Sequence, residues 1–157
     1  MSVDHGVAWF SVTKLVTMTA ALRAVEAGAL TLDAPVARWL PELATADRPT
    51  LRDLLAHRAG LPDPIPWGWL QPAPAPRRAD RGLAALARSA PSWWRGDPVE
   101  APARYSNLSY AAVGEVLRRA LQRPLVEILA STTEALGLTA TGFEPGGRAA
   151  AGHVPYG

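Results

Sequence analysis

Ser11 and Lys14 are the first residues whose types and spacing could support chemistry. A serine hydroxyl becomes a nucleophile when a neighbouring base removes its proton, and a lysine amine can be that base. Lys14 is the single lysine among 16 basic residues, and the other 15 are arginines, which stay protonated. The pattern Ser-x-x-Lys also occurs by chance, and Lys14 could be an accidental survivor in an arginine-rich composition. The spacing therefore raises a serine nucleophile as a hypothesis.

Tyr105 and Asn107 form a second polar pair, beside the expected start of a helix. A phenol at the end of a loop can exchange a proton with a nearby hydroxyl or amine. An asparagine two residues later offers both a donor and an acceptor. Alternatively, Tyr105 is an ordinary packed aromatic and Asn107 only caps the helix. The pair supports a reaction centre if the fold brings it to Ser11 and Lys14.

A helix from Val12 to Ala27 must position the first pair. Apolar residues recur along it with a helical period and alanines fill most of the gaps, so we expect it to be buried nearly all round. Ser11 and Lys14 are three residues apart and therefore share one helix face. Gly28 is expected to end this helix as its C-cap.

Three further helices are expected from their start signals. Thr50 and Asp53 resemble a capping box, Asn107 is a suitable N-cap, and Pro124 suits a first helical turn. The predicted ranges are 51–58, 108–121 and 124–136.

The remaining segments are expected to be short elements and loops. One short strand is expected within residues 1–10 and one short helix over 83–89. The proline-rich stretch 61–78 and residues 91–102 are expected to be loops. Their tryptophans would either wall a substrate cleft or pack structurally; these are Trp67, Trp69, Trp93 and Trp94.

Composition narrows the classes of function. The 157 residues fit one domain, and a net charge of +2 is too small to favour nucleic acid as a partner. The chain has no cysteine, and His5, His57 and His153 lack metal-ligand spacing, so we expect no metal and no cofactor. His57 is expected to be structural. No membrane span or signal peptide is recognised, which makes a cytoplasmic location the default expectation.

Taken together, Ser11-x-x-Lys14 and the distant Tyr105-x-Asn107 resemble the serine β-lactamase and penicillin-binding superfamily. The match is to its class C-like branch, which contains β-lactamase-related hydrolases, D-alanyl-D-alanine peptidases and esterases. Residues 32–42, 51–62, 105–114 and 136–141 also resemble family segments, with Ala59 where serine is usual. The resemblance runs in order through residues 8–153.

The resemblance implies a fold that is mostly α as it stands. It would be the helical portion of the β-lactamase/transpeptidase-like α/β fold, with most of the antiparallel sheet missing, so that residues 1–157 form a single incomplete domain. The family's third motif, Lys-Thr-Gly or His-x-Gly, is not found, and His153-Val-Pro does not replace it.

The resemblance also assigns roles in acyl transfer. Ser11 would be acylated by a small ester, amide or β-lactam, Lys14 and Tyr105 would move its proton, and Asn107 would bind the substrate. Which of Lys14 and Tyr105 is the base stays open. The family's second oxyanion donor comes from a strand, so we expect weak or no activity. The alternative is a non-catalytic remnant or helical interaction module, whose exposed apolar face would favour self-association.

Overall fold

The computed structural model describes residues 6–41, 49–61, 63 and 102–142. Over this part the order of elements is η1 (Phe10–Val12), α1 (Thr13–Glu26), η2 (Val36–Arg38), α2 (Leu51–Leu55), α4 (Asn107–Leu121) and α5 (Leu125–Ala135). An isolated antiparallel bridge pairs Pro35 with Thr50, and no run of strand occurs in the described ranges. The expectation of a mostly helical chain is therefore confirmed.

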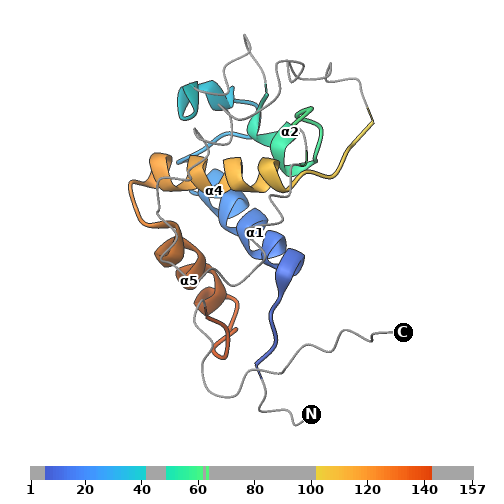
Figure 1. The fold of residues 1–157 in the computed structure, drawn as a ribbon. Coiled ribbons are helices and arrows are strands. Elements are labelled where there is room, and N and C mark those ends of the chain that lie inside the picture. The colour runs from blue at the N-terminus through green and yellow to red at the C-terminus, as the bar shows by residue number, and fades with distance from the viewer. Residues whose placement is uncertain (1–5, 42–48, 62, 64–101, 143–157) are drawn as a thin grey trace, which may run out of the picture.

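Helix α1 lies at the centre of the packing. Figure 1 shows α4 crossing α1, and contacts join α1 to both α4 and α5, while α2 packs on α4. The buried positions of α1 carry small or β-branched side chains, which lets the neighbouring helices approach closely. These residues are Val16, Thr17, Ala20, Ala21 and Ala24. Gly28, at φ 75°, follows the C-cap Ala27 and turns the chain away from the helix.

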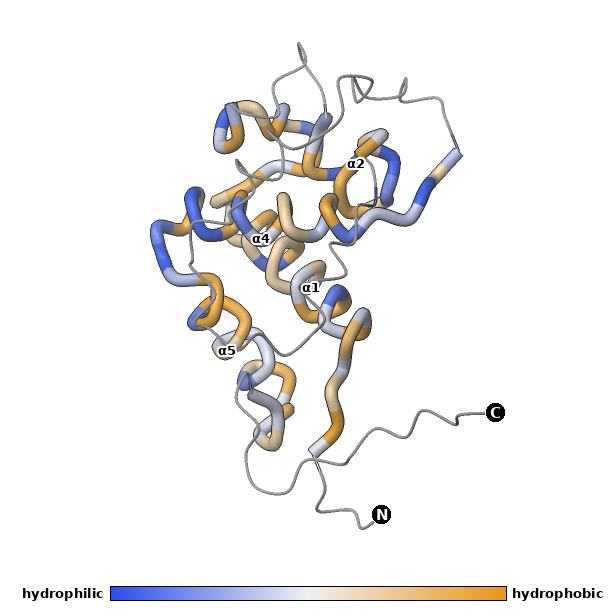
Figure 2. Tube along the Cα trace, in the orientation of Figure 1, coloured by the Kyte–Doolittle hydropathy of each residue, from blue (hydrophilic) through white to orange (hydrophobic). Residues whose placement is uncertain are grey.

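Only one face of α1 is buried. Leu15 is 59% exposed and Leu22 is 43% exposed, so the prediction of a helix buried nearly all round was wrong for the described structure. Helical periodicity identifies apolar positions, but it does not say how many neighbours cover them. Figure 2 also shows apolar residues in the segment that leads into α1, where Val7 and Phe10 are exposed.

The capping box of α2 is confirmed. The Thr50 side chain accepts the Asp53 N–H while the Asp53 carboxylate accepts the Thr50 N–H. The helix ends at Leu55, however, and not at residue 58 as predicted. His57 has φ 57°, a left-handed conformation that cannot continue a right-handed helix.

Two other helix starts differ from the predictions by one residue. Ser106, not Asn107, is the N-cap of α4, because its extended backbone lets its hydroxyl accept the Ser109 N–H. Asn107 is the first helical residue instead. Pro124 is the N-cap of α5 and lies just before the first turn.

The predicted strand near the N-terminus is not present over residues 7–10. Residues 7–9 have no regular structure, and Phe10 begins a 3-10 turn with φ 44°, which no strand residue adopts. The first five residues, the predicted helix 83–89, the four loop tryptophans, most of the stretch 61–78 and most of the C-terminal tail lie outside the described residues. Among the helices described, none is long and apolar enough to cross a membrane.

Candidate active site

Ser11 and Lys14 lie together at the start of the central helix. Ser11 is in the 3-10 turn that leads into α1, and Lys14 is in the first turn of α1 itself. The Lys14 Nζ donates to Ser11 Oγ over 3.3 Å. The predicted shared face is therefore present.

Tyr105 approaches Ser11 from a segment 94 residues away in sequence. It lies in the extended stretch before α4, and its phenol oxygen is 2.8 Å from Ser11 Oγ. The side chain is 50% exposed, so the group is open to a ligand from solvent.

Asn107 completes the cluster from the first turn of α4. Its Oδ1 accepts a hydrogen bond of 2.6 Å from Lys14 Nζ, and the Tyr105 hydroxyl donates to the same oxygen over 3.4 Å. The four candidate site residues thus lie within one hydrogen-bonded network. Ser11 and Lys14 come from the start of α1 and the turn before it, Tyr105 and Asn107 come from the start of α4 and the segment before it, and the packing of α1 on α4 brings the two pairs together.

Asp63 is a member of the site that the sequence did not reveal. Its Oδ1 accepts from the Asn107 backbone N–H at 2.9 Å and from Asn107 Nδ2 at 3.0 Å. Because Nδ2 is held by a carboxylate, Oδ1 must face the opposite way, toward Lys14. Asp63 lies in the proline-rich stretch, where no local pattern marks it as different from its neighbours.

His57 and Tyr110 form the wall behind the tyrosine. The His57 ring lies 4.8 Å from the Tyr105 ring and 5.1 Å from the Tyr110 ring, measured between centroids. Tyr110 donates its hydroxyl to the Leu55 carbonyl at 3.2 Å. His57 was expected to be structural, and these contacts place it directly against the site.

The charge of Lys14 acts on the phenol beside it. Its Nζ is 4.9 Å from the centroid of the Tyr105 ring. Hydrogen bonding to Lys14, and then to Ser11, lowers the pKa of the Tyr105 phenol from its ordinary 10.0. A hydroxyl, an amine and a phenol in direct contact can pass one proton among themselves, which is what activation of a serine requires.

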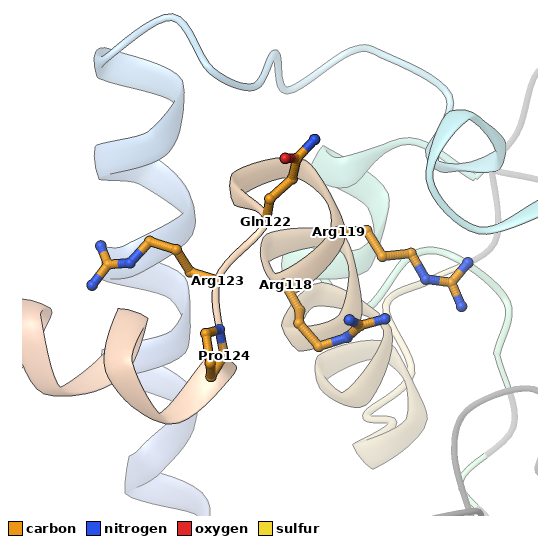
Figure 3. Close-up of a pocket in the computed structure, with 5 residues that line it drawn as sticks. All are labelled: Arg118, Arg119, Gln122, Arg123 and Pro124. Carbon is orange, nitrogen blue, oxygen red and sulfur yellow. The ribbon is translucent and has the colours of Figure 1, made fainter.

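A surface hollow lies at the C-terminal end of α4. Arg118, Arg119, Gln122, Arg123 and Pro124 line it (Figure 3). The Arg118 and Arg123 side chains point in opposite directions in this view, and Arg118 and Arg119 both bind Glu115. Arg118 lies eleven positions after Asn107 on α4, which is ~17 Å at ~1.5 Å per residue, so this hollow is distinct from the serine site.

No group of three potential metal ligands occurs in the part of the chain that the structure describes. His5 and His153 lie outside that part.

Comparison with known proteins identifies the family of this chain. The family model described as Beta-lactamase matches residues 1–156. The chain belongs to the β-lactamase family. A 57-residue stretch is 51% identical to Esterase EstB of Burkholderia gladioli and covers 32% of this chain and 14% of that esterase.

Solved structures extend the likeness to the fold. A class C β-lactamase from Rhodobacter sphaeroides is 32% identical with a TM-score of 0.58, over 81% of this chain and 34% of that one. EstCE1, described as a hydrolase with promiscuous acyltransferase activity, is 30% identical with a TM-score of 0.55, over 81% of this chain and 36% of that one. FmtA from Staphylococcus aureus, at 18% identity and a TM-score of 0.55, shares the fold.

The chain spans about a third of the length of these structures. The relatives that it matches in sequence and structure are described as a β-lactamase, an esterase and a hydrolase, and its described helices correspond to the helical portion of their fold.

Proposed function

We propose that the chain carries the acyl-transfer centre of a β-lactamase-related serine hydrolase. The observation that supports this most strongly is the 2.8 Å contact between Ser11 Oγ and the Tyr105 hydroxyl, with Lys14 bonded to the same serine. Ser11 Oγ would attack the acyl carbon of a small ester, amide or β-lactam. The bond from that carbon to the ester oxygen or amide nitrogen would break and this atom would take up the proton, leaving as an alcohol or amine or, in a β-lactam, staying tethered to the acyl group. Water would then hydrolyse the acyl-serine and restore the hydroxyl.

Lys14 and Tyr105 would share the proton transfers. Each contacts Ser11 Oγ, so either can accept the proton released on attack. The lowered pKa of Tyr105 makes its phenolate easier to form, which supports a role for it in passing the proton to the leaving group.

Asn107 would bind the acyl side of the substrate as well as hold Lys14. One Nδ2 hydrogen faces Asp63, and an amide nitrogen carries two hydrogens. The second hydrogen can therefore donate to a substrate carbonyl. Asp63 would keep the amide in the orientation that serves both contacts.

We also propose that the 157-residue chain by itself reacts slowly. The Ser11 backbone N–H would supply one oxyanion donor. The second donor that the family resemblance implies comes from a strand, and the described residues hold no run of strand. The loss of one such donor reduces kcat about 10²–10³-fold where it has been tested. Ser11-dependent turnover at the rate of a fully assembled oxyanion hole would contradict this part of the proposal.

The experiment is hydrolysis of p-nitrophenyl acetate and nitrocefin by the wild type, Ser11→Ala and Ser131→Ala. Ser131 lies on the exposed face of α5 and serves as the matched control. We expect slow hydrolysis of at least one substrate that is lost in Ser11→Ala and kept in Ser131→Ala. Equal rates in all three proteins would reject the serine mechanism.

A second candidate is an interaction module that associates with its own copies. It is favoured by the exposed apolar side chains before and along α1, which are Val7, Phe10, Val12, Leu15 and Leu22. The measurement is sedimentation velocity of the wild type and Leu15→Glu. Concentration-dependent dimers that disappear in the variant would support this role, and a monomer at all concentrations would reject it.

A further inference from the structure

His57 is attached to both residues that flank Tyr105. Its backbone carbonyl accepts the Arg104 N–H at 2.9 Å, and its ring Nδ1 accepts the Ser106 N–H at 3.1 Å. The His57 ring also packs against the Tyr105 ring. His57 therefore restrains Tyr105 through the residue before it, the residue after it and one face of its ring.

The left-handed backbone makes this arrangement possible. His57 follows α2 with φ 57°, and this turn directs its carbonyl and its ring toward the extended segment before α4. Histidine, asparagine and aspartate are the non-glycine residues most enriched in positive φ, so the position has few alternatives. The end of α2 needs only a residue that tolerates positive φ, whereas this position also uses the Nδ1 acceptor of the histidine ring.

We propose that His57 is a positioning residue, which holds the Tyr105 phenol against Ser11 by means of an uncharged ring whose Nδ1 accepts the Ser106 N–H. The inference rests on the proposed acyl-transfer role of Tyr105. His57 itself does not touch the reacting hydroxyl, and it acts through the segment 104–106.

Protonation of the ring would break this attachment. A protonated Nδ1 is a donor, and it would then face the Ser106 N–H, which is also a donor. The charged and titratable groups around the ring are Lys14, Asp63, Tyr105 and Tyr110. Burial, and then Lys14, lower the pKa of His57 from 6.5 and Asp63 opposes them, so the neutral ring persists into mildly acidic solution.

Two variants separate the acceptor from the ring. His57→Asn keeps an acceptor near the Nδ1 position and tolerates positive φ, whereas His57→Phe keeps an aromatic ring and removes the acceptor. The readout is the rate at which a fluorophosphonate labels Ser11. We expect about a tenfold loss in His57→Phe and less than about a threefold loss in His57→Asn.

A pH profile adds a readout that a merely structural role would not change. The labelling rate of the wild type is expected to fall in acid as His57 becomes protonated, and ¹⁵N NMR monitors that protonation. This fall should be absent in His57→Asn. Labelling of His57→Phe at the wild-type rate, or an equal loss of rate in both variants, would overturn the proposal.

The position of Tyr105 can be measured without any chemistry at Ser11. ¹³C-tyrosine NMR reports the pKa of the phenol, which should return toward 10.0 in His57→Phe as Tyr105 leaves Lys14 and Ser11. In the wild type, the Tyr105 signals should shift together with His57 protonation, which tests the idea even if His57→Phe does not fold. Tyr105 signals that stay unchanged while His57 is protonated would overturn the proposal. Tyr105 signals that shift with His57 protonation, in a protein whose Ser11 is not labelled, would reject only the proposed function.

Discussion

Replacement of Lys14 separates catalysis from folding at this site. Lys14→Met keeps the length of the side chain and removes the amine, while Lys14→Arg keeps the charge in a group that does not release a proton. The Lys14 Nζ lies 3.3 Å from Ser11 Oγ and 2.6 Å from Asn107 Oδ1, so both variants act on the reaction centre directly.

The catalytic loss should be much larger than the loss of stability. A positioned proton carrier contributes about 10²–10⁴-fold, which is ~2.7–5.4 kcal/mol at ~1.36 kcal/mol per factor of ten. The hydrogen bond to Asn107 involves a charged donor, worth ~1.5–3 kcal/mol when it is buried. Lys14 is only half-buried beside an exposed Ser11, so water can replace part of this bond and the free energy of unfolding should fall by about 1 kcal/mol or less.

The assay is the labelling rate of Ser11 by a fluorophosphonate, beside denaturant unfolding of each protein. Arg23→Met is the matched control, since Arg23 is an exposed cation further along the same helix. We expect both Lys14 variants to label at least a hundredfold more slowly and Arg23→Met to match the wild type. Labelling of Lys14→Met at the wild-type rate would refute the role of the amine.

Three other predictions follow from the same contacts. In ¹³C NMR, the Tyr105 phenol should titrate below 10.0 and return toward 10.0 in Lys14→Met, because hydrogen bonding to Lys14 is the main cause of its lowered pKa; an unchanged titration would count against it. Asp63→Ala should slow Ser11 labelling about tenfold without a large change in unfolding, because the amide it orients is released. Hydrogen bonding to Arg118 and Arg119 lowers the pKa of the Glu115 carboxyl from 4.5 to about 2. Between these two pH values the unfolded chain therefore binds more protons than the folded chain. The contribution of Glu115 to the free energy of unfolding should therefore be present above pH 4.5 and be lost toward pH 2, a fall on the order of 1 kcal/mol in urea unfolding. Glu115→Gln should remove this fall.

Local patterns accounted for much of the fold. The spacing of Ser11 and Lys14 fixed their common face, because helical geometry depends only on sequence separation. The reciprocal bonds of Thr50 and Asp53 lie within one turn and were predictable for the same reason.

Features that depend on distant segments were missed. Asp63 meets Asn107 across 44 residues and His57 meets Ser106 across 49, and no local rule connects such positions. The exposure of Leu15 likewise depends on which neighbours cover α1, not on the pattern of α1. Tyr105 and Asn107 stood out locally as a polar pair, but they were linked to Ser11 and Lys14 because family resemblance carries information about distant contacts that composition and periodicity lack.

The most direct test of the reaction centre is the mass of an acyl-enzyme. The chain would be incubated with a penicillin and with p-nitrophenyl acetate, quenched in acid and digested for peptide mapping. We predict an acyl group on the peptide that contains Ser11, present in the wild type and in Ser131→Ala and missing in Ser11→Ala. The same adduct in Ser11→Ala, or an adduct on another residue in its place, would contradict it.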